Sequence, residues 1–325
     1  MKKQFTLLAA LLILATSAWA QKEFKLAKTT GRLNLNINGA IIEGYSGNEI
    51  IFTTQNSEDE VVDERAKGLQ ALSGSGFVDN TGLGLDVSKN GEDVNVNMVG
   101  KKLTGILSIK VPQNVKISFS NASNLYHDEV ILKNLKNEIE VSTTYNKIKL
   151  ENNTGPMNIK TVYGAIDAVF ASDIKGPVSI ISVYNYVDVT LPATVKANIE
   201  LGTSYGKLYA ADQFKIAIDK NSVSEDKSSN SDAVSVNGVT INRVGSTRSI
   251  SSSSAGSQNK LAEITVTGRR SDGDSAPGTV WNTGDVIVRG FSNFRGGEHI
   301  KGTINGGGVD LILKSNYKNV YLRQK

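Results

Sequence analysis

The sequence contains no cysteine, only two histidines and only five prolines among its 325 residues. The absence of cysteine excludes disulfide bonds, thiol nucleophiles and cysteine-based metal sites. The low proline content is compatible with many strands, because proline cannot donate to a β-ladder. The chain must therefore be held by its own hydrophobic core, which a chain of this length is large enough to build.

Long apolar runs are also absent, apart from one at the N-terminus. Lys2 and Lys3 precede an apolar stretch at 7–16, and "AWA" at 18–20 provides small residues before Gln21. This is the pattern of a secretory signal peptide. No later segment approaches the roughly 20 apolar residues of a membrane span, and no cysteine is available for a lipid anchor. The sequence predicts a signal peptide at 1–20, no transmembrane anchor, and export of a non-lipoprotein to the periplasm, the outer surface or the medium.

A strong charge imbalance is missing as well. The formal net charge is +4, and without the two lysines of the predicted signal peptide it is +2. No dense basic stripe is present, so there is no electrostatic argument for binding nucleic acid. We expect a glycan, an envelope component or another protein as partner, and no nucleic acid.

Alternation of apolar and polar residues dominates what is present. It occurs in "RLNLNIN" (32–38), "DVNVNMV" (93–99) and "VKISFS" (115–120), with glycine and asparagine between such runs. A period of two over short runs indicates many short strands. A short helix or a mobile loop is favoured only at 60–72. The sequence therefore predicts an all-β protein.

A repeat occupies the middle and the end of the chain. The stretch "STTYNKIKLE" (142–151) has four further copies, "KTVYGAIDAV", "ISVYNYVDVT", "GTSYGKLYAA" and "KSNYKNVYLR". In each copy a serine or threonine stands two residues before a tyrosine, and positions −6, −4, +3 and +5 from that tyrosine are apolar. The repeated tyrosines are Tyr145, Tyr163, Tyr184, Tyr205 and Tyr317.

The repeat predicts two short strands joined by a corner. From −6 to the tyrosine the period is two, so the aliphatic residues, the hydroxyl and the tyrosine are expected to share one inward face. The alternation then slips by one, which places a corner at Asn146, Gly164, Asn185 and Gly206, residue types that readily adopt a left-handed backbone. The first four tyrosines are 18, 21 and 21 residues apart. This spacing predicts a single-stranded β-solenoid of stacked turns of about 20 residues.

One segment interrupts the repeat. Residues 221–260 include "SVSEDKSSNSD" and "STRSISSSSAGS", which are rich in serine and poor in bulky apolar residues. Such a composition is typical of a flexible insertion. We expect a first solenoid part at 21–220 and C-terminal turns at 261–325, beginning with the strand-like "AEITVTG" and "DVIVRGF".

The series "TTYNKIKLEN", "TVYGAIDAV", "TSYGKLYA" and "INGGGVDLILKSNYKNVYLR" resembles the adhesin-like domains of exported bacterial envelope proteins of the Bacteroidetes type. The resemblance covers roughly 30–215 and 280–325, and "IIEGYSGNEIIF" (41–52) is similar to the opening turn of such domains. It implies a β-solenoid fold and, by fold analogy alone, a role in adhesion.

Two carboxylates are candidates for chemistry on the outward face. Asp167 and Asp188 occupy position +4 of successive turns, and stacked strands lie about 4.8 Å apart. Such a pair could bind a cation or act as the two acids of a retaining glycosidase. The alternative is a solvated face on which Lys149 and Lys207 reduce the repulsion.

Tyr186, Tyr209 and Tyr321 are also expected to point outward. They could form a platform for sugar rings or for a protein partner. The alternative is that they are ordinary surface tyrosines, because tyrosine is common on exposed sheet faces.

Other catalytic signals are weak. His127 and His299 lie in loop-like stretches, and the sequence has neither a phosphate-binding loop nor a G-x-S-x-G motif. We therefore predict no catalytic residue, cofactor or metal. The first hypothesis is a non-enzymatic exported envelope or cell-surface protein that serves as an adhesin or interaction scaffold. The alternatives are a polysaccharide lyase or glycoside hydrolase on a β-helix and a periplasmic modulator of envelope stress.

Overall fold

The computed structural model describes residues 22–55, 64–103, 105–171, 173–219, 235–236, 239–240 and 297–325. The predicted signal peptide, the strand-like stretches at 262–268 and 285–291, and all but four residues of the serine-rich segment lie outside the described residues. In the described part of 60–72, the helix predicted as one possibility is reduced to one 3-10 turn, η1 (Glu64–Ala66).

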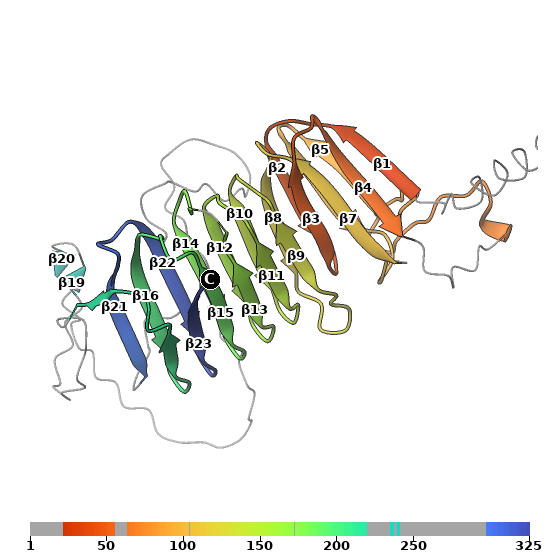
Figure 1. The fold of residues 1–325 in the computed structure, drawn as a ribbon. Helices are drawn as coiled ribbons and strands as arrows, with labels where there is room; N and C mark the ends of the chain where they lie inside the picture. The colour runs from red at the N-terminus through yellow and green to blue at the C-terminus, as the bar shows by residue number, and fades with distance from the viewer. Residues whose placement is uncertain are drawn as a thin grey trace, which may run out of the picture. The chain divides into compact units, whose positions relative to one another are not determined.

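The described residues form an all-β structure with two large sheets, neither of which closes on itself (Figure 1). Sheet A contains, in spatial order, β1 (Lys22–Ala27), β4 (Glu49–Gln55), β7 (Ile106–Pro112), β3 (Ala40–Tyr45), β9 (Val130–Lys133), β11 (Ile148–Glu151), β13 (Ile166–Val169), β15 (Val187–Leu191), β23 (Val320–Gln324) and β17 (Leu208–Ala210). Sheet B contains β18 (Ile216–Ile218), β21 (Glu298–Ile304), β16 (Ala197–Thr203), β22 (Val309–Ser315), β14 (Val178–Ser182), β12 (Met157–Thr161), β10 (Ile139–Thr143), β8 (Lys116–Asn121), β2 (Arg32–Asn36), β6 (Asp93–Met98) and β5 (Leu85–Asn90). A separate small unit contains the antiparallel pair β19 (Ser235–Val236) and β20 (Val239–Thr240).

Most strands belong to layers, each made of one strand in sheet B and the next strand of the chain in sheet A. In spatial order the layers are β6/β7, β2/β3, β8/β9, β10/β11, β12/β13, β14/β15, β22/β23 and β16/β17. Neighbouring layers pair in parallel and in register, so that Ile139 lies beside Met157 and Met157 beside Val178. The repeat in the sequence is therefore a repeat of these layers.

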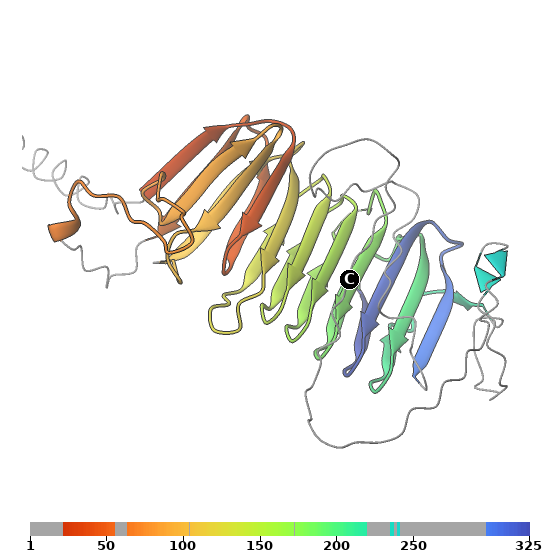
Figure 2. The same cartoon turned by 180° about the vertical axis from the view of Figure 1, so that it is seen from behind.

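The order of the layers departs from the order of the chain at both ends. The β2/β3 layer lies between β6/β7 and β8/β9, which follow each other in sequence. The β22/β23 layer lies between β14/β15 and β16/β17 in the same way (Figure 2). The prediction that the segment "IIEGYSGNEIIF" forms one turn is wrong. It spans β3 and β4, which both lie in sheet A, and β4 runs antiparallel to β7.

Antiparallel strands extend the sheets beyond the outermost layers. At one end β4 and β1 extend sheet A, and β5 extends sheet B. At the other end β21 and β18 extend sheet B, whereas sheet A ends, within the described residues, at β17. Sheet B is therefore longer than sheet A by two strands at this end.

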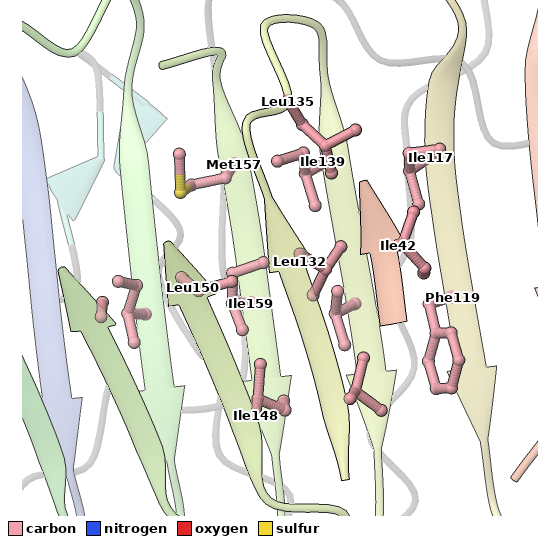
Figure 3. Close-up of a cluster of buried hydrophobic side chains, with 14 of the residues drawn as sticks. Ile42, Ile117, Phe119, Leu132, Leu135, Ile139, Ile148, Leu150, Met157 and Ile159 are labelled. Carbon is pink, nitrogen blue, oxygen red and sulfur yellow. The ribbon is translucent and has the colours of Figure 1, made fainter. Parts of the chain in front are cut away.

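The hydrophobic core lies between the two sheets. Figure 3 shows Ile42, Leu132 and Leu150 of sheet A opposite Ile117, Ile139 and Ile159 of sheet B, all of them buried. Each such side chain contributes about 1.5–3 kcal/mol by its burial. The predicted inward positions −6, −4, +3 and +5 are buried in every copy of the repeat except at Leu208 and Ala210 of β17.

Candidate interaction surface

The repeated tyrosines point outward at the corner between the sheets, and the prediction that they face the core is wrong. Tyr163, Tyr184 and Tyr317 are 39%, 41% and 41% exposed, and Tyr205 is 73% exposed. The alternation of inward and outward residues slips before the tyrosine rather than after it: position −2 is buried, while −1 and the tyrosine lie in the turn. The aliphatic positions are inward whether the slip comes before or after the tyrosine. Only the direction of the tyrosine distinguishes the observed arrangement from the predicted one.

The aromatic rings stack on one another in a continuous row. The tyrosine row comprises, in spatial order, His127, Tyr145, Tyr163, Tyr184, Tyr317 and Tyr205. Successive ring centroids are 5.4, 4.6, 4.8, 4.6 and 5.0 Å apart, and the ring planes are inclined by 24° or less. The inner rings therefore cover one another's faces and present their edges and hydroxyl groups to solvent. The neighbouring Tyr184 phenol is the main cause that raises the pKa of Tyr317.

A buried relay of hydroxyl groups holds the row in place. Four hydroxyl groups at position −2 make the same two hydrogen bonds. Each accepts from the backbone N–H three residues later and donates to the corner carbonyl of the layer before it in space. The four belong to Thr161, Ser182, Ser315 and Thr203. For example, the Ser182 hydroxyl accepts from Asn185 N–H at 3.1 Å and donates to the Gly164 carbonyl at 2.7 Å. The conserved spacing of hydroxyl and tyrosine within the repeat thus has a structural cause.

Glycine is needed at the corner because of a close contact between layers, and not because of a left-handed backbone as predicted. Neither Gly164 nor Gly206 has a positive φ. A Cβ at Gly164 would collide with the Asn146 carbonyl oxygen of the neighbouring layer. Two asparagines at the opposite corner, Asn134 after β9 and Asn152 after β11, do adopt the left-handed backbone, with φ of 57° and 56°.

His127 joins the row at its first layer, which the sequence did not predict. Beneath it, the buried Asn121 side chain donates to Asn146 Oδ1 at 2.9 Å and to the Tyr126 carbonyl at 3.1 Å. These bonds take the place of the hydroxyl relay between the β8/β9 and β10/β11 layers, where the Thr143 hydroxyl of β10 is buried without a partner. No periodic signal identified His127, because it lies in a loop outside the repeat.

Asp167 and Asp188 are neighbours on the outer face of sheet A, as predicted. Each is bound to its own cation: Lys147 Nζ lies 2.9 Å from Asp167, and the Arg323 guanidinium binds both oxygens of Asp188 at 2.8 and 3.0 Å. The hydrogen bond with Asp167 raises the pKa of Lys147. The neutralising groups are thus Lys147 and Arg323, whereas Lys149 pairs with Glu129 at 3.0 Å.

The three predicted platform tyrosines lie together on the same face. Tyr209 and Tyr321 stack with centroids 5.3 Å apart and planes inclined by 9°, and Tyr186 meets Tyr321 edge-on at 6.4 Å. The Arg323 guanidinium lies 5.3 Å from the Tyr321 ring. A pocket of about 340 Å³ opens where β17 ends beside the longer β23, lined among others by Tyr209, Ala211 and Arg323.

His299 lies on strand β21, on the outer face of sheet B, rather than in a loop as predicted. Its Nε2 is 3.3 Å from Glu200, which also pairs with Lys301 and Lys314. Within the described ranges no group of three or more histidine and acidic side chains could hold a metal ion.

Comparison with known proteins provides little. No family model and no curated protein matches the sequence. One solved structure, titled "putative cell adhesion protein" from Clostridium sporogenes, is 11% identical and covers 94% of this chain and 100% of its own, with a TM-score of 0.37. That similarity does not define a shared fold. No helix in the described part of the chain is long and apolar enough to cross a membrane.

Proposed function

We propose that the protein is a non-enzymatic, exported envelope or cell-surface protein that acts as an interaction scaffold of the adhesin type, and that its layers are the turns of a β-solenoid. The predicted signal peptide supports export. The parallel, in-register layers support the solenoid, because every layer has one strand in each sheet and pairs with its neighbours in the same register.

The observation that carries the proposal is the tyrosine row. Exposed aromatic side chains that gather in one place are typical of interaction surfaces, where tyrosine is enriched. The row is also rigid before binding, since four of its tyrosine N–H groups bond to the neighbouring layer, as Tyr184 does to the Val162 carbonyl at 2.8 Å; the other three are those of Tyr163, Tyr317 and Tyr205. A partner that meets such a preordered surface has little side-chain entropy to remove.

The geometry favours a polar partner over flat stacking of sugar rings. The faces of the inner rings are covered by their neighbours, so a partner contacts ring edges and a line of phenolic hydroxyl groups. Phenolic hydroxyls both donate and accept hydrogen bonds. Glycan hydroxyl groups or the polar rim of a protein surface would match this line.

Binding of the purified mature chain to envelope extracts and to a panel of polysaccharides tests the proposal. The double variant Tyr163→Ser/Tyr184→Ser interrupts the row at two layers, and we expect it to bind about tenfold more weakly than the parent, which is about 1.4 kcal/mol. Leu69→Ser/Leu72→Ser is the matched control, because both leucines are highly exposed and belong to no strand or row.

Two results would contradict the proposal. One is that the row variant, shown to be folded by its melting curve, binds as tightly as the parent. The other is turnover of a polysaccharide that disappears in Asp188→Asn, which would favour the enzyme alternative despite the ion pair between Asp188 and Arg323.

A further inference from the structure

The outer edge of β17 exposes backbone hydrogen-bonding groups. Lys207, Tyr209 and Ala211 face β23, as shown by the bonds from Val320 N–H to the Lys207 carbonyl at 3.0 Å and from Ala211 N–H to the Leu322 carbonyl at 2.8 Å. The groups of Leu208 and Ala210 therefore point away from β23.

Those outward groups lack a neighbouring strand among the described residues. The Glu298 carboxylate accepts from Leu208 N–H at 3.2 Å, where a strand carbonyl would otherwise lie. No described residue bonds to Ala210 N–H. An open edge of this kind is a template for another strand.

The inward side of the same end is an incomplete piece of core. In sheet B, β21 and β18 continue two strands beyond β16, and Ile300 and Ile218 lie on their inward side, in line with Leu201 and Ile199 of β16. Ile218 is 49% exposed, and Leu208 and Ala210 are incompletely buried, although the equivalent positions of all other copies are buried. We call these incompletely buried apolar positions, Leu208, Ala210, Ile218 and Ile300, the notch; Phe214, between β17 and β18, is buried at the same end.

The aromatic side chains of this last layer are also left with one open face. Among the described residues, Tyr205 stacks only on Tyr317, and Tyr209 stacks only on Tyr321. In the interior of the row, Tyr163 stacks on a ring at either side. Within the described part of the chain, backbone, core and ring contacts all stop at the same edge, and all three would continue if one more strand were added.

We propose that the edge of β17 is a strand-addition site, into which an extended segment of a partner polypeptide inserts as the next strand of sheet A. This rests on the proposed role as an interaction scaffold and identifies a partner class for it. The segment carries aliphatic residues at alternate positions, which fill the notch against Ile218 and Ile300. It carries a planar residue between them, which covers the open face of Tyr209. Main-chain hydrogen bonds supply affinity, and the alternate side chains supply specificity.

The dimensions of the notch favour a single segment over a second copy of this chain. Two strands of sheet B project beyond β17, which is about 10 Å at the usual strand spacing. Two copies that met through β17 would bring these projecting strands into collision. The opposite end of the chain does not fit either, because there sheet A projects by one strand only, β1.

The test uses the full mature chain and a labelled synthetic peptide, KNVYLRQK, which is the sequence of residues 318–325. Within the chain this sequence already pairs with the other side of β17, with Val320 beside Leu208 and Tyr321 beside Tyr209. We expect saturable binding by fluorescence anisotropy and slower exchange of the Ala210 amide, because the Ala211 amide is already bonded to the Leu322 carbonyl. The control peptide KNSYSRQK keeps the charge and the tyrosine but loses both aliphatic residues, and we expect it to bind about tenfold more weakly.

Matched protein variants locate the site. Ile218→Ser removes an exposed aliphatic residue from the notch and is expected to weaken peptide binding about tenfold. Ile106→Ser changes a residue that is 62% exposed at the start of β7, away from the notch, and should leave binding unchanged. Melting curves of both variants confirm that each is folded.

Three results would overturn the proposal: no binding at millimolar peptide, equal binding of both peptides, or an Ala210 amide that is already protected in the isolated monomer. The last result would mean that the chain covers this edge itself. Failure of the peptide with intact binding of envelope extract through the tyrosine row would remove the strand-addition site and leave the proposed function standing. Peptide binding without any binding of extract or polysaccharide would support the strand-addition site and contradict the role proposed for the tyrosine row.

Discussion

At the scale of single residues, the buried hydroxyl groups connect the layers as directly as the aliphatic core does. Ser182 bonds to two different layers, because its hydroxyl accepts from Asn185 of its own turn and donates to Gly164 of the neighbouring one. Ser182→Ala leaves both backbone groups without that partner. We expect a loss of about 1–3 kcal/mol in the free energy of unfolding, measured by urea denaturation.

The same strand provides the control for this prediction. Ser179 is equally small and buried, but its hydroxyl has no hydrogen-bond partner in the structure. Ser179→Ala should therefore change stability little. Equal losses in the two variants would show that the relay does not stabilise the stack.

Because the tyrosines point outward and the aliphatic residues inward, we expect substitutions at the two kinds of position to differ in their effect on stability. Ile180 is fully buried, so Ile180→Lys places a charge in the core and should unfold the middle of the stack. Tyr163→Asp removes stacking at an exposed position and should cost about 0.5–1.5 kcal/mol, leaving the protein folded. Thermal melts separate the two outcomes, and unfolding by Tyr163→Asp would mean that the ring is part of the core.

At the scale of elements, one carboxylate joins β16 to the two strands on either side of it. Burial alone would raise the pKa of Glu200, but the hydrogen bond and charge of Lys314 on β22, together with Lys301 and His299 on β21, bring the pKa below its ordinary value of 4.5. A carboxylate with a depressed pKa stabilises the fold above its unfolded-state pKa, and this stabilisation is lost as the pH falls through the lower folded-state pKa.

We therefore expect the β16–β21 junction to loosen on acidification below about pH 4.5, and less so in Glu200→Gln. Amide exchange in β21, followed from pH 6 to pH 3, measures this. Glu23→Gln is a suitable control, because the ion pair of Glu23 is local: its partner is Lys25, at 2.8 Å, on the same edge strand β1. Identical acid sensitivity in Glu200→Gln and the parent would contradict the prediction.

At the scale of the whole unit, the C-terminal layer of the chain lies inside the stack. The β22/β23 layer pairs with β14/β15 on one side and with β16/β17 on the other. An ordinary repeat array grows by adding layers at its end, and each layer contacts only its sequence neighbours. Here the last residues of the sequence complete an internal layer, so the contacts that close this part of the stack are long-range.

Deletion of 309–325 should therefore be far more damaging than deletion of a layer at an edge. It exposes core residues of β14 and β16 together, and we expect loss of cooperative unfolding in the second half of the repeat. Deletion of 22–27 removes only the edge strand β1 and should leave a cooperative transition. Urea denaturation followed by circular dichroism compares the two, and equal behaviour would show that the internal layer is dispensable.

The sequence by itself determined the strands of the repeat, their inward aliphatic positions and the pairing of the successive layers from β10/β11 to β14/β15. Positions such as Ile139 and Ile148 are apolar in every copy, and a side-chain period of two leaves only one face for them when layers stack in register. The adjacency of Asp167 and Asp188 follows from the same register. These properties are local and repeated, so the pattern alone was sufficient.

Only the tertiary structure decided the direction of the tyrosines, the order of the layers and the partners of the charges. Tyrosine is amphipathic, so the sequence pattern is compatible with an inward or an outward ring. In the structure the hydroxyl at position −2 bonds to a corner carbonyl of the neighbouring layer, and the tyrosine lies beyond it in the turn, with its ring outward. The position of the Tyr317 layer between those of Tyr184 and Tyr205 depends on long-range pairing, which no spacing encodes. Arg323 reaches Asp188 for the same reason: the layer that carries it is distant in the chain and adjacent in space.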